Sequence, residues 1–251
     1  MQAIKISAVS YINSIPFIYG IEHSGYIKQK FQLFKDIPSE CGDKLLKKRV
    51  DLGLVPIAII PQLETYEIIS DFCIGSNRNV RSVILFSDVP LRDLEAIYLD
   101  YQSRTSALLT KILAKFYWKI DPVWFETIEG YEQDLPVGSA GLLIGDRTFF
   151  MKKKYKFIID LAEEWYNFTG LPFAFACWVA NKNLDIEFLA DFNSALEFGV
   201  KNIATSLHSL ASKYDNKFDE FYHYLTHNIS YKLDDHKRKA MSMFFNYAKE
   251  L

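Results

Sequence analysis

Short runs of β-branched and apolar residues alternate with helical patterns along most of this 251-residue chain. Alternation of this kind is typical of βαβ units, in which helices cover a mostly parallel sheet. Strands are expected over residues 3–9, 50–55, 81–87, 96–99, 123–125, 140–144 and 173–180. Between them we expect a helix over residues 39–49, capped by Ser39, and another over residues 103–117. The sequence therefore predicts an α/β fold.

The part of the chain after residue 183 is expected to be helical. Apolar residues recur there in steps of four and three, which places them on one helical face: Leu196, Val200, Ile203, Leu207, Leu210 and Tyr214. The aromatic residues between Phe218 and Leu225 predict a second helix. Asp234 or Asp235 is expected to cap a third helix that runs to the C-terminus.

The length suits either one large α/β domain or two lobes of roughly 100 residues or more. No flexible linker interrupts the pattern, so two lobes would be joined by crossing strands near residues 87–92 and 170–176. This arrangement predicts a discontinuous first lobe, residues 1–88 and 174–251, with residues 89–173 inserted as a second lobe. A ligand is then expected in the cleft between the lobes, where loops at the carboxyl ends of strands converge.

Charge and composition argue against several classes of function. The net charge is −2, so no global positive field recruits nucleic acid. Two short basic runs, residues 152–154 and 236–239, are expected to be solvated faces. No apolar run reaches 18 residues, and residues 1–6 lead into a strand rather than forming a signal peptide. We therefore expect a cytoplasmic protein, monomer or homodimer, with no nucleic-acid or membrane partner.

Metal and redox sites are not expected. Cys41, Cys73 and Cys177 are odd in number and far apart, which fits neither a disulfide framework nor a cysteine zinc site. His223 and His227 have the spacing of a two-histidine metal face, but no Glu follows His223 as it does in HExxH. The nucleotide-binding motifs GxGxxG and GxxxxGK[ST] and the nucleophile motif GxSxG are also missing. We expect no metal and no cofactor.

Three loops share one design, in which a strand ends, polar residues follow and a helix begins. Their candidate residues are Ser10, Tyr11 and Asn13 in the first, Ser103, Arg104, Thr105 and Ser106 in the second, and Gly145 and Asp146 in the third. Unpaired N–H groups and the helix dipole favour anions at such places, and hydroxyl groups add donors. The second loop is the strongest candidate, because a carboxylate there would accept several charge-assisted hydrogen bonds. Simple helix capping is the alternative for each loop.

Three polar residues, one of them already named, stand at predicted strand ends. Ser82 opens a strand, where it would meet a carboxylate bound at the lobe junction or would simply lie in a turn. Asp100 and Asp146 each follow a strand, and a salt bridge to a neighbouring Arg is favoured over a catalytic role for both. The residues alone thus predict an anion-binding cleft.

Six segments in order, with a C-terminal tail, resemble a known family. They are VSYINSIPFIYG (9–20), DLGLVPIA (51–58), NVRSVILFS (79–87), SRTSALL (103–109), GLLIGDRT (141–148), LPFAFACWVA (171–180) and ISYKLDD (229–235). Together they resemble the chorismate dehydratase family of the futalosine route to menaquinone. The later lyase of that route favours a Ser-Pro-Cys-Pro-Asn-Asp type of N-terminal loop, from which Ser10-Tyr11-Ile12-Asn13-Ser14 differs.

The resemblance implies a periplasmic-binding-protein-like fold of type II, with two α/β lobes around the ligand. It also implies a cofactor-independent carbon–oxygen lyase that converts chorismate to 3-[(1-carboxyvinyl)oxy]benzoate and water. Asn13, near the departing hydroxyl, and Ser82, on one substrate carboxylate, are then the expected catalytic residues. The expected substrate-binding residues are Ser10, Tyr11, Ser103, Arg104, Thr105, Ser106, Gly145 and Asp146.

The base that removes the ring proton is left open, because the resembling segments contain no histidine. Either the enolpyruvyl carboxylate of the substrate or a protein carboxylate such as Asp146 would serve. Two other functions stay open as well. One is a non-catalytic protein of the same fold that binds a small carboxylate, and the other is the later lyase, which acts on a cyclic futalosine-derived substrate.

Overall fold

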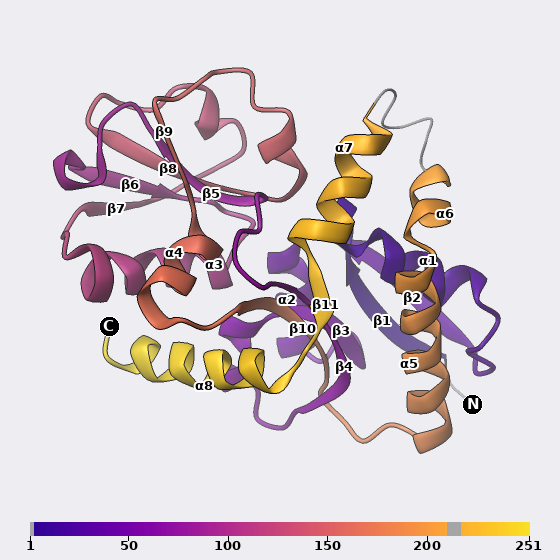
Figure 1. Cartoon of the computed structure of the whole chain (residues 1–251). Coiled ribbons are helices and arrows are strands. Elements are labelled where there is room, and N and C mark those ends of the chain that lie inside the picture. The colour runs from indigo at the N-terminus through magenta and orange to yellow at the C-terminus, as the bar shows by residue number, and fades with distance from the viewer. Residues whose placement is uncertain (1–2, 210–216) are drawn as a thin grey trace.

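The computed structural model describes residues 3–209 and 217–251, and its strands form two sheets with helices packed around each (Figure 1). The first sheet has the order β11-β4-β10-β3-β1-β2, with β1 (Ile4–Val9), β2 (Phe31–Asp36), β3 (Leu52–Pro56), β4 (Glu67–Ser76), β10 (Phe173–Ala180) and β11 (Ser230–Lys232). The second has the order β7-β6-β8-β5-β9, with β5 (Val83–Ser87), β6 (Ala96–Leu99), β7 (Val123–Glu126), β8 (Ser139–Ile144) and β9 (Phe157–Asp160). Each sheet with its helices is called a lobe below.

Both sheets are mixed, whereas the sequence pattern predicted a mostly parallel one. In the first lobe β1 runs parallel to β2 and β3, but β10 runs antiparallel to β3 and β4. In the second lobe β6 runs parallel to β7 and β8, but β5 runs antiparallel to β8 and β9. β5 and β10 are the strands that follow the crossings between lobes. They enter the sheet without the helical return that a parallel neighbour needs.

The chain crosses between the lobes at residues 77–82 and 170–172. The second crossing falls within the expected range of 170–176. The first lies before β5, and not at residues 87–92, because every residue of β5 is buried and the strand pairs with β8 and β9 on its two sides. Residues 83–87 therefore belong to the second sheet, although the sequence placed them with residues 1–88.

The helices of the described residues are α1 (Ile15–His23), α2 (Pro38–Leu46), α3 (Thr105–Ile112), α4 (Leu161–Thr169), α5 (Ile186–Lys201), α6 (Ile203–His208), α7 (Phe218–His223) and α8 (Asp235–Lys249). α2 starts at Pro38 and not after a Ser39 cap, because proline suits the first helical turn. α3 starts two residues later than expected and continues as a π-helical turn to Trp118. Within residues 3–209 and 217–251, no helix combines the length and apolar character needed to cross a membrane.

The expected C-terminal helices are present with one break. The apolar stripe is divided between α5 and α6, which separate at Asn202, and its last members, Leu210 and Tyr214, lie outside the described residues. α7 continues as a π-helical turn to Asn228. Asp234 caps α8, accepting the backbone N–H of Lys237 at 2.9 Å.

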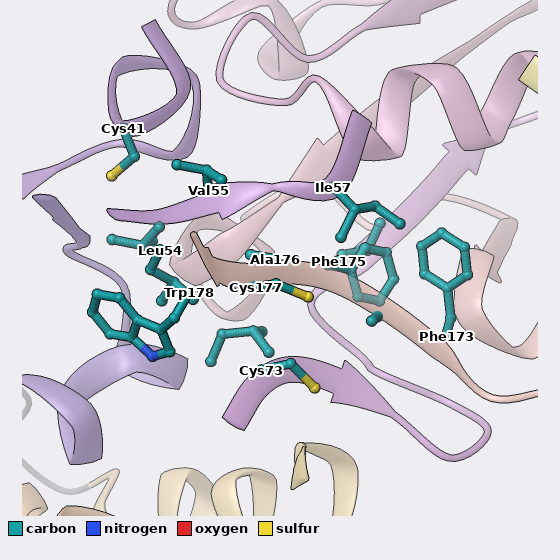
Figure 2. Packing of buried hydrophobic residues seen from close by; sticks show 14 of the residues in the cluster. Cys41, Leu54, Val55, Ile57, Cys73, Phe173, Phe175, Ala176, Cys177 and Trp178 are labelled. Atoms are coloured by element: carbon teal, nitrogen blue, oxygen red, sulfur yellow. The ribbon is translucent and has the colours of Figure 1, made fainter. Parts of the chain in front are cut away.

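β10 forms the centre of the first sheet, between β3 and β4, and all its residues are buried. A strand covered on both faces reads as a continuous apolar run, as FAFACWVA does. Figure 2 shows β10 among its neighbours, with Trp178 and Cys177 beside Leu54 of β3 and Cys73 of β4. The three cysteines are buried and unpaired thiols.

α1 and α5 pack in unusually close contact because two glycines meet at their interface. A Cβ atom added to Gly20 would lie 1.9 Å from the carbonyl oxygen of Ala195. One added to Gly199 would lie 1.8 Å from the carbonyl oxygen of Pro16. The backbones of the two helices therefore touch directly at this point.

Lys237 is fully buried, although the basic run around it was expected to be a solvated face. Its Nζ atom donates to Asn77 Oδ1 at 3.1 Å, Ser230 Oγ at 2.9 Å and Asp234 Oδ2 at 3.1 Å. An ammonium group has three donors, and burial is tolerated here because each has an acceptor. Lys237 thus ties the first crossing to β11 and to the start of α8.

Candidate active site

A cavity lies between the two lobes and holds about 510 Å³ of space, part of it open to solvent. β1, β3 and β8 reach it at their carboxyl ends, through Val9, Pro56 and Ile144. This is the position at which open α/β sheets bind ligands. Phe175 of β10 lines the cavity, whereas Trp178 packs in the core against Phe17 at 5.8 Å between ring centroids.

Seven predicted site residues line this cavity: Tyr11, Asn13, Ser82, Ser103, Thr105, Ser106 and Gly145. The other three are engaged outside that lining. Ser10 is exposed, and its backbone N–H donates to the carbonyl of Asp36 at 2.8 Å. Arg104 donates from Nη2 to Asp43 Oδ1 at 2.9 Å, and Asp146 Oδ1 accepts the N–H of Ile12 at 2.9 Å. Both contacts join the second lobe to the first.

Asp100 holds the second and third loops in place. Its carboxylate accepts the N–H groups of Gln102 and Ile144, each at 2.9 Å, and pairs with the guanidinium of Arg147. The salt bridge predicted for Asp100 is therefore confirmed. Burial raises the pKa of Asp100, while Arg147 and the two N–H donors oppose that rise. Its role is to fix where Ser103 and Gly145 stand.

The hydroxyl groups of the second loop differ in whether they are free to donate a hydrogen bond to a ligand. Ser103 Oγ accepts the N–H of Ser106 at 3.0 Å, so its own proton is left to donate. Thr105 Oγ1 donates to the carbonyl of Phe175 at 3.0 Å and accepts the N–H of Ala58 at 3.3 Å. Those partners belong to the first lobe, so the Thr105 hydroxyl joins the lobes and is not left for a ligand.

Tyr224 holds Ser82 from outside the cavity lining. The phenol of Tyr224 donates to Ser82 Oγ at 2.6 Å. Burial raises the pKa of Tyr224 above its usual 10, so the phenol keeps its proton at neutral pH. Tyr231 donates to the backbone carbonyl of Asn13 at 3.0 Å and fixes that loop from the other side.

Gly145 and Tyr11 close one side of the cavity. Gly145 has φ +69°, and a Cβ atom there would lie 2.4 Å from Cε2 of Tyr11. Only glycine therefore allows the aromatic ring to lie on this backbone. The Tyr11 phenol donates to Gln102 Oε1, and the carbonyl of Gln102 accepts the N–H of Ser39 at 3.2 Å. The two lobes are in direct contact at this rim.

The described residues that line the cavity include no Asp, Glu, His, Lys, Arg or Cys. Tyr11 is the titratable group among them, and burial raises its pKa well above 10. Polar contacts are thus offered by hydroxyl and amide groups, which bind an anion without a neutralising charge. Such a cavity orients an anion and stabilises charge on it, but lacks a side chain that accepts a proton near neutral pH.

The sequence did not single out Tyr224, Tyr231 or Gln102 as site residues. Tyr224 lies 142 residues from Ser82 in the chain and has no motif around it, so no local signal marks it. Tyr231 belongs to the tail ISYKLDD, and that segment was the one signal in the sequence that could have marked it as a site residue. The rings of His223 and His227 stack 4.2 Å apart, and no cluster of three or more metal-ligating side chains occurs in the part of the chain described.

A family model described as menaquinone biosynthesis matches residues 4–250. The chain belongs to this family. Two curated relatives of this menaquinone biosynthesis protein are named chorismate dehydratase. The Thermus thermophilus protein is 28% identical over 199 residues, covering 71% of this chain and 70% of the relative. The Campylobacter jejuni protein is 26% identical over 251 residues, covering 97% and 96%.

Solved structures place this family member in a known fold. A protein from Archaeoglobus fulgidus has a TM-score of 0.71 at 13% identity, covering 99% of this chain and 97% of the other. A Candida albicans protein described as having the generic periplasmic binding protein fold has a TM-score of 0.72 at 13% identity, covering 100% and 91%. The alkanesulfonate-binding protein SsuA of Xanthomonas axonopodis scores 0.65 at 12% identity, covering 98% and 93%. The predicted periplasmic-binding-protein-like fold is confirmed.

Proposed function

We propose that this protein is a chorismate dehydratase, a cofactor-independent carbon–oxygen lyase acting in the cytoplasm. It would convert chorismate to 3-[(1-carboxyvinyl)oxy]benzoate and water. The observation that carries the proposal is the interlobe cavity, which offers neutral donors and no acidic side chain among its described lining residues. Chorismate is a dicarboxylate, and acidic groups would repel it. The names of the two curated relatives support the same reaction.

The residue roles follow from which donors stay available. Ser103 and Ser106, with the backbone N–H groups of their loop, hold one substrate carboxylate. Ser82 holds the other, and Asn13 hydrogen-bonds the departing ring hydroxyl. Thr105 stabilises this arrangement indirectly, because its hydroxyl is already engaged in hydrogen bonds that join the lobes.

The chemistry needs little beyond orientation. The C–H bond at the ring carbon that bears the ether breaks, and its electrons form a ring double bond. The C–O bond to the hydroxyl on the next ring carbon breaks, and the departing hydroxide takes up a proton and leaves as water. The ring becomes aromatic, which supplies the driving force, so the protein mainly positions the substrate and stabilises developing charge. We assign the base to the substrate's own enolpyruvyl carboxylate, since none of the described lining residues is a base.

The test is incubation of purified, metal-free protein with chorismate, with products separated by chromatography and identified by mass. Loss of one water with formation of an aromatic enolpyruvyl ether is the expected result. Unchanged chorismate that still raises the melting temperature would favour a binding protein of the same fold. Turnover of a cyclic futalosine-derived substrate in its place would favour the later lyase. An Asp146→Asn protein that folds but has lost all activity would point to a protein base.

A further inference from the structure

We propose that Tyr224 is a positioning residue of this site: it donates its phenol proton to Ser82 and so commits the Ser82 hydroxyl to donate to the substrate. The inference rests on the proposed function and deepens it. Tyr224 does not line the cavity and acts through Ser82, which does.

Packing and burial fix the position of the Tyr224 phenol. The Tyr224 side chain is 1% exposed, and its oxygen lies 2.6 Å from Ser82 Oγ. The ring of Phe149 packs edge-on against it, with centroids 4.8 Å apart. Ser82 is equally buried at 1%, so the pair is held by packing on both sides and the short contact persists without solvent competition.

The direction of each proton follows from the chemistry of the two hydroxyl groups. A phenol is a stronger acid than the aliphatic hydroxyl of serine and is therefore the better donor of the pair. The single proton of the Tyr224 phenol accordingly goes to Ser82 Oγ, 2.6 Å away. Ser82 Oγ then accepts, and its own proton is directed to the cavity.

The consequence is a hydroxyl that behaves as a fixed donor. A carboxylate oxygen accepts a hydrogen bond from it without either partner having to reorient. A ligand that presents a neutral donor group at this position would instead face another donor. Without the Tyr224 oxygen, the Ser82 proton is free to turn away from the substrate. The loss should resemble that of one hydrogen bond to a charged group, about tenfold to hundredfold in kcat/KM.

A double-mutant cycle on chorismate turnover tests this coupling. The proteins are wild type, Tyr224→Phe, Ser82→Ala and the double variant, and Tyr155→Phe is the matched control. Tyr155 is also a buried phenol, donating to the carbonyl of Glu132 at 3.1 Å, but it lies away from the cavity. Both Tyr→Phe proteins should lose similar thermal stability. Tyr224→Phe alone should lose kcat/KM, and the double variant should be no worse than Ser82→Ala, within about twofold.

Losses that multiply in the double variant would show that Tyr224 does not act through Ser82. An unchanged kcat/KM in Tyr224→Phe, or an equal loss in Tyr155→Phe, would also overturn the proposal. If the wild type binds chorismate without converting it, the same cycle is measured on dissociation constants, and only the proposed reaction has failed. If it neither converts nor binds chorismate, the proposed function fails and this inference fails with it.

Discussion

At the level of single residues, some members of the site can be recognised from the sequence, whereas others come together only in the folded structure. The hydroxyls of the second loop stand next to one another in the chain, so their shared place in the cavity could be predicted from a strand followed by a helix. Which of them is free to donate could not, because Thr105 meets partners 47 and 70 residues away. Tyr224 was missed for the same reason. A hydrogen bond between distant segments produces no repeating pattern in the sequence from which it could be predicted.

Gly145→Ala is expected to lower activity at the residue scale. Its φ of +69° costs an alanine about 1–2 kcal/mol, and the new methyl group would displace the Tyr11 ring from the cavity wall. Gly130→Ala is the matched control, because Gly130 has φ +89° but no atom within 4 Å of the added methyl. Thermal melts should show destabilisation in both proteins, with the larger loss in Gly145→Ala because its methyl must also displace the Tyr11 ring. Steady-state turnover of chorismate should fall only in Gly145→Ala, and an equal fall in both would remove the role given to Tyr11.

At the scale of elements, the long apolar patterns were the reliable ones. The run at 173–180 predicted β10 because both faces of that strand are covered. β2 and β11 were not predicted, since they are edge strands in which polar residues interrupt the apolar pattern. β9, also an edge strand, was missed because its apolar run is only three residues long. β4 was missed because polar residues such as Asp71 interrupt it. The mixed strand directions were also missed, because they follow from the crossings and not from local pattern.

Gly199→Ala should destabilise the contact between α1 and α5. The added methyl has no room against the Pro16 carbonyl, so the helices must move apart, at a cost of about 1–3 kcal/mol. Gly42→Ala, also in a helix, is the control, because its methyl would meet Ile59 at an ordinary 3.5 Å. Alanine is the better helix former by about 1 kcal/mol, so Gly42→Ala should be neutral or stabilising. Denaturant unfolding measures both, and equal effects would contradict the tight interface.

For the whole molecule, the sequence predicted two lobes with a discontinuous first one, but set the first crossing too late. The error concerns β5, whose apolar residues suit either sheet equally well and acquire their place only through pairing with β8 and β9. The interlobe contacts could not be predicted either. Gln102 with Tyr11, and Arg104 with Asp43, meet only once both lobes have formed.

Lys237→Met is expected to loosen the first crossing from β11 and from the start of α8. It removes three hydrogen bonds of a buried ammonium, including those to Asn77 and Asp234, so we expect a loss of about 2–3 kcal/mol. For a chain of this length that lowers the melting temperature by roughly 5–10 °C. Lys239→Met, on the exposed side of the same helix, should stay within about 0.5 kcal/mol of wild type. Calorimetry compares the two, and matching melting temperatures would show that the buried contacts add nothing.

The central place of β10 has a consequence for how the chain is made. All five strands of the second sheet, Val83 to Asp160, leave the ribosome before β10 does, so that lobe is complete in sequence while the first is not. β4 pairs with β10 and β11, and β3 reaches β4 only through β10. During synthesis the edges of β3 and β4 therefore wait unpaired while about 100 further residues are translated. The nascent chain is most open to misassembly in that interval, which ends when Phe173–Ala180 joins β3 to β4 and leaves only the outer edge of β4 waiting for β11.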